Sequence, residues 1–252
     1  MRQEYVLKLL EADERVDGRK LDEFRNIKIE TDIIERAEGS ARVKIGKTDV
    51  IVGIKMDLAE PFPDIPDEGM LKTGAEFSPI ASPDFTSGPP GEDATELARI
   101  VDRGIRESEC IDLEKLCLKS GEKVWCVFVD VHMINHDGNL IDTSALAAVA
   151  ALMKTKIPEL KGDEIIRDKL KKKLPIKHTP ITITVGKVLG KFLIDPIREE
   201  EEVLDSKLTV AVMEDGKICA MQKSGNQGLS DEETIKMIDL AIKKSKEIRK
   251  LL

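Results

Sequence analysis

The segment Lys123–Asn135 reads KVWCVFVDVHMIN and is an almost continuous apolar run. Such a run is typical of a strand that is buried on both faces of a sheet, so we expect Trp125 to pack in the core. The turn His136–Asn139 (HDGN) follows it, and an alanine-rich stretch from Asp142 to Lys154 comes next. Asp-Gly is a strong turn signal, and the alanine-rich stretch predicts a helix that packs closely against a sheet.

The rest of the chain places similar elements on both sides of this unit. Alternating apolar and polar residues predict strands, and apolar residues three and four apart predict helices. Before the unit we expect a helix over 1–14, a strand over 24–34, a hairpin of 41–45 and 50–56, and a helix over 92–108. After it we expect strands over 181–185, 188–194, 207–213 and 217–222. A final helix begins at Ser230, where Glu233 completes a capping-box pattern, and its apolar stripe is Ile235, Ile238, Ile242 and Ile248.

Three segments lack a regular pattern. Residues 57–91 contain seven of the eleven prolines, and we expect either an irregular but ordered loop or a contact surface for a partner. The charged stretch 162–173 separates the two groups of strands, and its cluster Lys169–Lys173 is interpreted as a solvated helix face, like the C-terminal lysines. The acidic run Glu199–Glu202 is interpreted as a solvated loop.

The two halves of the chain have a weak internal similarity. Each contains strands, a Gly-Lys hairpin turn (Gly46-Lys47 and Gly216-Lys217) and then a helix, which favours a duplicated unit. Runs of strands followed by helices indicate an α+β fold class with mixed or antiparallel sheets. We therefore expect an N-terminal helix and arm over 1–24, a first lobe over 25–160 and a second lobe over 180–252.

The composition limits the kinds of function. Lys and Arg number 40 against 48 Asp and Glu, which gives a net charge of −8, and 41% of the residues are hydrophobic. That hydrophobic content is enough for a core and excludes disorder as the main state. Six Phe, one Tyr and one Trp leave few rings for base stacking, so the acidic chain is a poor candidate for a nucleic-acid binder that acts alone.

The first 30 residues contain no secretory signal, and the longest apolar run, Ala145–Met153, is too short to span a membrane. The four cysteines have neither metal-ligand nor redox spacing: Cys110, Cys117, Cys126 and Cys219. We therefore expect a cytoplasmic protein with no membrane contact, no metal site and no cofactor.

Three arginines form the most informative charged cluster. Arg99, Arg103 and Arg106 lie at i, i+4 and i+7 of a predicted helix, so we expect all three to point the same way. Their mutual repulsion indicates either an anionic ligand, such as a phosphate backbone, or a structural face. Three arginine contacts on a single strand give a salt slope of only about −2, which fits a contribution to a shared RNA site. In the structural interpretation, nearby acids relieve the repulsion, namely Glu96, Asp102 and Glu107.

Several motifs along nearly the whole chain resemble one known family. They are Arg15-x-Asp17-Gly18-Arg19-x-x-Asp22-Glu23-x-Arg25, Glu38-Gly39-Ser40-Ala41, Gly46-Lys47-Thr48, Asp137-Gly138-Asn139 and Glu214-Asp215-Gly216-Lys217. Together they resemble the RNase PH family of phosphate-dependent exoribonucleases, which shorten RNA from its 3′ end and release nucleoside diphosphates. The resemblance implies an RNase PH-like fold of two βαβα-type lobes.

Within this family, the proline-rich loop and the segment 124–152 are similar to the non-catalytic RNase PH-like subunit of the archaeal exosome. That resemblance implies a catalytic RNase PH-like paralogue as partner, with three heterodimers in a hexameric ring around a channel for single-stranded RNA. It also implies RNA-binding cap proteins. Arg99 and Arg103, and more weakly Arg106, are then expected to bind RNA beside the partner's active site.

Departures from the active family pattern predict the loss of catalysis. Active members follow the Asp-Gly turn with a small residue, a hydroxyl residue and an arginine, which hold the attacking phosphate at a helix N-terminus. This chain has Asn139, Leu140 and Ile141 there, and the next residue, Asp142, would repel a phosphate. Asp205 falls near the position of a catalytic acid, but the residues before it differ in length and composition.

We therefore predict no catalytic residues in this chain. It is expected to be a non-catalytic subunit of a 3′-to-5′ RNA-degrading exosome ring that structures the active site of its partner and contacts RNA. The alternative is an active phosphate-dependent 3′-to-5′ exoribonuclease with an atypical phosphate site. A small-molecule kinase on a similar scaffold would need a glycine-rich phosphate loop, which the sequence lacks.

Overall fold

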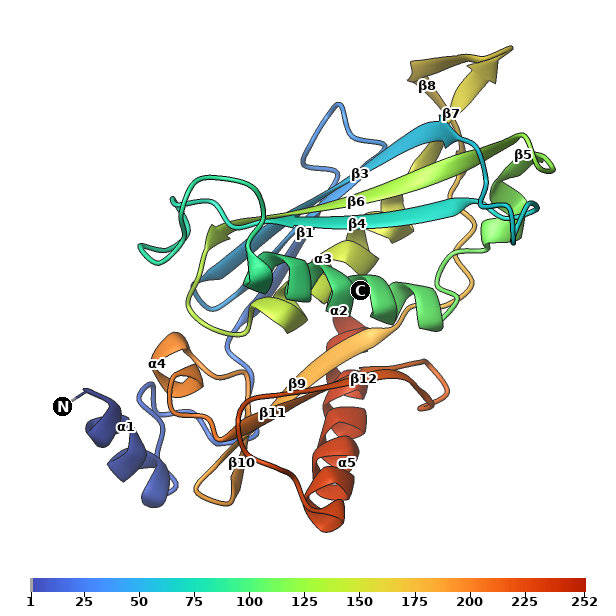
Figure 1. The fold of residues 1–252 in the computed structure, drawn as a ribbon. Coiled ribbons are helices and arrows are strands. Elements are labelled where there is room, and N and C mark those ends of the chain that lie inside the picture. Colours follow the sequence, from blue (N-terminus) through green and yellow to red (C-terminus); the bar gives the residue numbers. More distant parts are fainter. Residues whose placement is uncertain (1) are drawn as a thin grey trace.

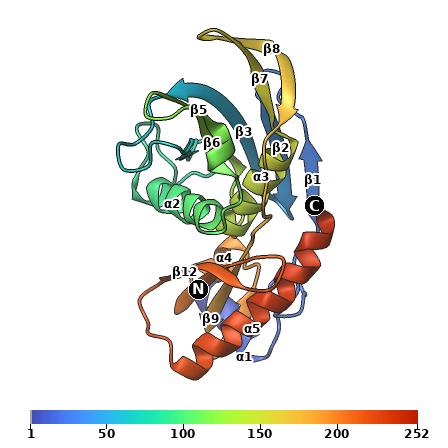
Figure 2. The ribbon, with the colours of Figure 1, turned by 90° about the vertical axis from the view of Figure 1, so that its right-hand side faces the viewer.

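The chain stacks its sheets and helices in four layers (Figure 1). This computed structural model describes residues 2–252, apart from the side chain of Lys171. A first sheet packs on the helices α2 (Glu92–Glu107) and α3 (Leu140–Lys154), which pack in turn on a second sheet. The helix α5 (Asp231–Ile248) covers the far side of the second sheet, as the turned view also shows (Figure 2). The predicted α+β class is confirmed, and α2 and α3 are the helices predicted over 92–108 and 142–154.

The first sheet is centred on β6 (Lys123–Asn135), whose bounds match the predicted strand. Its strand order is β1-β2-β3-β6-β4, and the short β5 pairs with the start of β6. Only β4 runs parallel to β6; the other pairs are antiparallel. The further strands are β1 (Ile27–Thr31), β2 (Gly39–Ile45), β3 (Thr48–Ala59), β4 (Met70–Glu76) and β5 (Cys117–Lys119), and a 3-10 turn covers Leu113–Leu116.

One face of the first sheet forms the main core. Trp125 is only 4% exposed and packs there, as predicted. The prediction that β6 is buried on both faces is correct for Val124–Val127. It is wrong for the later part of the strand, where His132 is exposed. The reason is that α2 and α3 both lie on the same side of the sheet, between it and the second sheet (Figure 1).

The second sheet is antiparallel, with strand order β10-β9-β11-β12. Its strands are β9 (Ile181–Val188), β10 (Lys191–Ile194), β11 (Ser206–Val212) and β12 (Ile218–Ser224), and the short helix α4 (Arg198–Glu201) lies between β10 and β11 in sequence. The predicted capping box of α5 is confirmed, because Ser230 and Glu233 bond each other's backbone N–H groups. Its predicted stripe is wrong for Ile235, which is 60% exposed, since the buried face of α5 is centred on Met237 and Ala241. A final 3-10 turn covers Arg249–Leu251.

The N-terminal helix α1 (Arg2–Glu11) packs on the second lobe although it precedes the first lobe in sequence. Its Val6 and Leu10 form a small apolar cluster with Val188 and Leu193. The following arm continues along the same lobe, where the backbone N–H of Ile194 donates to the carbonyl of Leu21. The chain therefore ties its start to its second half.

Two segments differ from the sequence-based expectation. The proline-rich stretch 57–91 contains the strand β4, so it is not one irregular loop. The charged stretch near 162–173 forms a hairpin of β7 (Lys156–Lys161) and β8 (Glu164–Lys173), with Gly162 at its turn, so Lys169–Lys173 lies on a strand and not on a helix. Figure 2 shows this hairpin extending from the body of the protein. No helix within residues 2–252 is long and apolar enough to cross a membrane.

Candidate functional site

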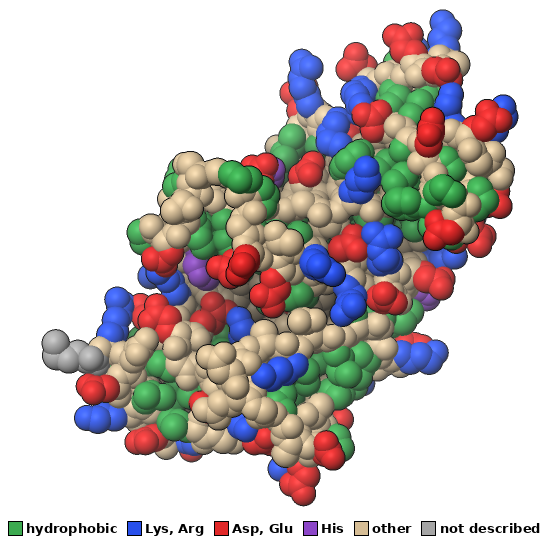
Figure 3. Space-filling model, in the orientation of Figure 1, with side chains coloured by type: hydrophobic (Ala, Val, Ile, Leu, Met, Phe, Trp, Pro, Cys, Tyr) green, Lys and Arg blue, Asp and Glu red, His purple; other side chains and the backbone are tan. Residues whose placement is uncertain are grey.

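The helix α2 borders a cleft between the two lobes. Its buried face, which includes Leu97, Val101 and Ile105, packs into the core, so its charged face is left to line the cleft. The cleft has a volume of about 920 Å³. Figure 3 shows it as a hollow, with acidic side chains over the start of α2 and basic ones over its middle. Residues of the second sheet form the opposite wall, namely Thr182, Thr209, Ala211, Ala220, Met221 and Gln222.

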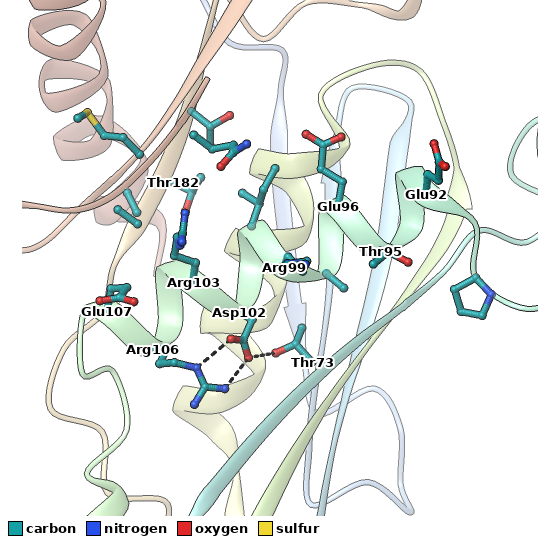
Figure 4. Close-up of a pocket in the computed structure, with 18 of the residues that line it drawn as sticks. Thr73, Glu92, Thr95, Glu96, Arg99, Asp102, Arg103, Arg106, Glu107 and Thr182 are labelled. Atoms are coloured by element: carbon teal, nitrogen blue, oxygen red, sulfur yellow. Dashed lines mark hydrogen bonds and ion pairs between the residues drawn. The ribbon is translucent and has the colours of Figure 1, made fainter. Parts of the chain in front are cut away.

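The three predicted arginines all line this cleft, but they are not equivalent. Arg106 is held by Asp102 (Nε to Oδ2, 2.9 Å) and donates to the carbonyl of Leu71 at 3.0 Å. The expectation that all three point the same way is therefore wrong for Arg106, because Asp102 turns it toward Thr73, whereas Arg103 extends toward Thr182 (Figure 4).

Arg99 and Arg103 are exposed, and neither forms a hydrogen bond or ion pair with any residue in 2–252. The acids Glu96 and Glu107, which could have relieved the arginine repulsion, also form no such bond with the described residues. Two guanidinium groups therefore keep all their donors available to a ligand, while the neighbouring carboxylates limit the positive potential. This arrangement suits a local contact with an anion and not independent binding of a long polyanion.

A second, smaller cleft of about 400 Å³ lies at the start of α3. The helix begins after Asn139, whose φ of +57° places it in the left-handed region. The backbone N–H of Asn139 donates to Oε1 of Glu201 at 3.0 Å, so a carboxylate of the chain itself occupies the position where a helix N-terminus attracts an anion. Leu140 and Ile141 line the same cleft and offer no side-chain donor.

The charges around this second cleft are predominantly negative. Its lining includes Asp93, Glu96 and Glu201 but only one lysine, Lys207. Burial lowers the pKa of His136, the other basic group of the lining, which favours its neutral form. A phosphate dianion entering here would meet more acids than bases, which is unfavourable in a partly desolvated site.

Asp142, predicted to repel a phosphate, is buried and is not on the cleft surface. Its Oδ2 accepts from the backbone N–H of Thr184 at 3.0 Å, which links α3 to the second sheet. Burial raises its pKa to about 7. The residue therefore contributes to the contact between the lobes, and its charge is only partly developed at neutral pH.

Asp205, near the position expected for a catalytic acid, is bonded away from both clefts. Its Oδ1 accepts from Nε2 of Gln227 at 2.8 Å, and its Oδ2 accepts from the backbone N–H of Leu189 at 3.2 Å. Neither cleft has Asp205 in its lining. Its observed contacts fasten two loops of the second lobe together.

The arginine-rich signature near the N-terminus joins the two lobes. Arg15 forms a bidentate pair with Glu200 (Nε to Oε1, 3.0 Å; Nη2 to Oε2, 2.5 Å), and both side chains are fully buried. Arg25 pairs with Asp195 (Nη2 to Oδ1, 2.6 Å) and donates to the carbonyl of Asp137 at 2.6 Å. Asp195 also accepts from Nδ2 of Asn139 at 2.8 Å. These bonds fix the start of α3 against the second lobe.

The interpretation of Glu199–Glu202 as a solvated loop is therefore wrong for Glu200 and Glu201. Sequence reasoning missed both, because their partners, Arg15 and the backbone of Asn139, are far away in the chain. The only sequence signal for these pairings was the number of arginines in the N-terminal signature, because arginines that become buried need acidic partners elsewhere in the chain. No group of three or more His, Cys, Asp or Glu side chains in residues 2–252 is arranged to hold a metal ion.

Comparisons with known proteins agree with this architecture. Residues 23–158 match the description "3' exoribonuclease family, domain 1", and residues 178–244 match "3' exoribonuclease family, domain 2". The exosome complex component Rrp42 of Thermococcus gammatolerans is 49% identical over 251 residues, which cover 98% of this chain and 92% of that protein. Rrp42 of Archaeoglobus fulgidus is 49% identical over 249 residues, 99% of this chain and 95% of that protein.

Solved structures show the same relationship. A chain of the Archaeoglobus fulgidus exosome with RNA bound to the active site superposes with a TM-score of 0.93 at 48% identity, covering 99% of this chain and 96% of that chain. A chain of an archaeal exosome core gives a TM-score of 0.88 at 46% identity, with 98% and 94% covered. Rice Rrp46, at 19% identity and a TM-score of 0.70 over 94% and 97% of the two chains, shares the fold. The chain thus belongs to the 3′ exoribonuclease, or RNase PH, family, through both of the family's domains.

Proposed function

We propose that this chain is a non-catalytic subunit of a 3′-to-5′ RNA-degrading exosome ring and that it contributes Arg99 and Arg103 to an RNA site completed by a catalytic partner. Relatives at 49% identity carry the name exosome complex component Rrp42. A chain that superposes with a TM-score of 0.93 comes from an exosome with RNA bound to the active site. These similarities support membership of such an assembly.

The observation that most strongly supports the non-catalytic role is the position of the Glu201 carboxylate at the start of α3. Phosphorolysis needs an inorganic phosphate held beside the RNA 3′ end, and a helix N-terminus is a natural site for it. Here Glu201 accepts from the backbone N–H of Asn139, and the surrounding cleft carries an excess of acids. The alternative, an active exoribonuclease with an atypical phosphate site, gains no support, because Asp205 bonds to Gln227 and Leu189 and lies outside both clefts.

RNA contact is assigned to the two arginines without an intramolecular partner. Two phosphate contacts on single-stranded RNA correspond to a salt slope of about −1.4, so this chain adds to an RNA site but does not hold RNA strongly by itself. Arg106 has a smaller role in this proposal, because Asp102 and the carbonyl of Leu71 already take up its donors.

The proposed partners follow from the same assignment. A catalytic RNase PH-like paralogue supplies the phosphate site and the acid, three such heterodimers form a hexameric ring, and RNA-binding cap proteins sit on that ring. A cytoplasmic location also belongs to this proposal.

The test uses the ring reconstituted from this chain and its catalytic paralogue. Arg99→Ala with Arg103→Ala should raise the KM for single-stranded RNA about 10-fold, which corresponds to ~1.4 kcal/mol of lost binding. Arg36→Ala, an exposed arginine outside the cleft, is the matched control and should change nothing. Unchanged degradation by a correctly assembled double variant would show that the two arginines do not contact RNA.

A further inference from the structure

Three sulfur-containing side chains lie together at one end of the first sheet. Met70, Cys117 and Cys126 belong to a small apolar cluster that is separate from the main core. The expectation of no metal site considered only the spacing of cysteines along the chain. Strand pairing, which that spacing does not reveal, brings two of the four cysteines and a methionine to the same place.

The strands β4 and β5 follow one another along the same edge of β6. The other edge of β6 pairs with β3 from Val124 to Asn135, so β4 and β5 share the edge that is left. Met70, the first residue of β4, is directly opposite Cys126, and Cys117, the first residue of β5, is directly opposite Val124. Residues two apart on a strand point to the same face, so all three sulfur-containing side chains lie on one face of the sheet.

The separations between these residues suit a metal ion better than a disulfide. Neighbouring strands lie about 4.8 Å apart, which sets the spacing of Met70 and Cys126. Cys117 and Cys126 are diagonal neighbours, for which Cα atoms lie about 7–8 Å apart, beyond the range of about 4.4–6.8 Å in disulfides. With metal–sulfur bonds of about 2.3 Å, three sulfur atoms around one ion lie about 4 Å apart. The two cysteines reach that spacing when their side chains turn toward each other.

The surroundings of the three sulfur atoms are apolar. Val124 and Phe128 pack in the same cluster. Cys126 is 1% exposed and Met70 is 7% exposed, whereas Cys117 is half-buried at the margin. An ion therefore enters past Cys117 and loses its water among apolar side chains. Such an environment favours an ion of low charge whose bonds to sulfur replace its hydration.

The charged groups near Cys126 fit an anionic metal–thiolate centre. Burial raises the pKa of Cys126, while the charge of Lys72 acts against this shift and that of Asp57 adds to it. Lys72 lies two residues after Met70 on the same face, so its ammonium group is close to the cluster. Asp57 opposes Cys126 from β3, but it is near Arg167, with 3.7 Å between Nη2 and Oδ2, which partly balances its charge.

We propose that Cys117, Cys126 and Met70 bind one soft monovalent metal ion of the Cu(I) class. Thiolate and thioether ligands select Cu(I), whereas carboxylate and carbonyl ligands suit Mg²⁺, Ca²⁺ and Mn²⁺. Zn²⁺ is disfavoured, because its structural sites take four ligands from Cys, His, Asp and Glu, and no group of even three such side chains in residues 2–252 is arranged to hold a metal.

Binding to this site is an exchange of protons for metal. Each of the two thiols releases its proton to the solvent as its sulfur bonds to the ion, and the ion is neither oxidised nor reduced. The resulting centre carries one negative charge close to Lys72. None of the three ligands lines either cleft, so the site is separate from the proposed contact with RNA.

Titration of the purified full-length chain with Cu(I), buffered by bicinchoninate under anaerobic conditions, tests the site. Wild type should bind one equivalent, with three sulfur atoms at about 2.3 Å in X-ray absorption. Cys117→Ala should weaken binding at least about 100-fold, because loss of an outer-shell partner alone costs about 10–100-fold. Met70→Leu conserves volume and should weaken binding about 10-fold, with two sulfur atoms left. Cys219→Ala is the matched control, since this half-buried cysteine lies outside the cluster and should leave the affinity unchanged.

Urea unfolding of each variant shows whether it is folded, and the conservative Met70→Leu keeps the test decisive if Cys117→Ala is not. Affinities for Cu(I) that agree within about two-fold among wild type and the folded cluster variants would overturn the site. Tighter binding of Zn²⁺ than of Cu(I) would overturn the assignment to a soft ion. A disulfide between Cys117 and Cys126 in air, together with no binding of Cu(I) by the reduced chain, would overturn the metal site in favour of a redox pair.

Discussion

A Gly138→Ala substitution in the Asp137-Gly138 turn tests how closely the two lobes approach each other, because it adds a single methyl group at their contact. Gly138 has φ +83°, and a Cβ added there would lie 2.3 Å from the carbonyl oxygen of Pro196 and 2.7 Å from the backbone N of Arg198. Both are backbone atoms, so they cannot rotate away as the end of a side chain could. Gly138→Ala should therefore push the turn away from the segment that leads into α4, and with it the carboxylate of Glu201 away from Asn139.

The expected loss in the free energy of unfolding follows from a comparison with a second Asp-Gly turn. Gly216, after Asp215, has φ +85° and no atom within 4 Å of an added Cβ. Alanine in the left-handed region costs roughly 1–2 kcal/mol at either position. Overpacking adds about 1–3 kcal/mol at Gly138 alone. We expect Gly216→Ala to lower the free energy of unfolding by about 1–2 kcal/mol and Gly138→Ala by about 2–5 kcal/mol.

The assay is urea unfolding followed by far-UV circular dichroism, with the slope against denaturant checked for constancy across the three proteins. The cost of placing alanine in the left-handed region is the same in both variants. The difference between their free energies of unfolding therefore measures the contact of the added methyl group with residues 196–198. Equal destabilisation of both, within about 0.5 kcal/mol, would refute the close approach of the lobes at this turn.

Two further variants test the buried charges. Asp195→Asn should lower the free energy of unfolding by about 3 kcal/mol, because Arg25 loses its buried counter-charge. The control is Asp32→Asn, at an exposed aspartate whose φ of +58° is similar to the +48° of Asp195, and it should change the free energy of unfolding by less than about 0.5 kcal/mol. Equal effects of the two would show that the Asp195 contacts do not stabilise the fold. The raised pKa of Asp142, about 7 against 3.8, means that the folded chain holds a proton that the unfolded chain has released, so this group makes stability fall as pH rises from about 4 to 7. Urea titrations at pH 5, 6 and 7 should therefore show a slope against pH that is more negative in wild type than in Asp142→Asn, by up to about 1.4 kcal/mol per pH unit between pH 5 and 6 and by about half as much close to pH 7. Parallel slopes would contradict the burial of its charge.

The sequence predicted the elements that have strong local patterns. The strand Lys123–Asn135 was found with its bounds, because its apolar run is long and the HDGN turn ends it. The strand β4 was missed, because only Leu71 and Ala75 of its residues belong to the main core and prolines surround it in sequence. Its pairing with β6 is parallel and distant, so no hairpin turn marks it.

The candidate site was predictable only in part. The spacing of Arg99, Arg103 and Arg106 predicted all three on one helix. That Arg106 is already bonded and the other two are not depends on Asp102 and on the carbonyl of Leu71, which belongs to the strand β4. The role of Glu201 could not be inferred, because a run of four acids gives no sign of which member meets a helix N-terminus. Such pairings are set by the packing of the lobes and leave no periodic trace in the sequence.

The most direct test of the non-catalytic role uses the isolated chain, purified without its paralogue, with 5′-labelled single-stranded RNA and inorganic phosphate. We predict no shortening of the RNA and no nucleoside diphosphate until the catalytic paralogue is added. Release of nucleoside diphosphates by the isolated chain, abolished by Asp205→Asn, would contradict the account and favour an active exoribonuclease with an atypical phosphate site.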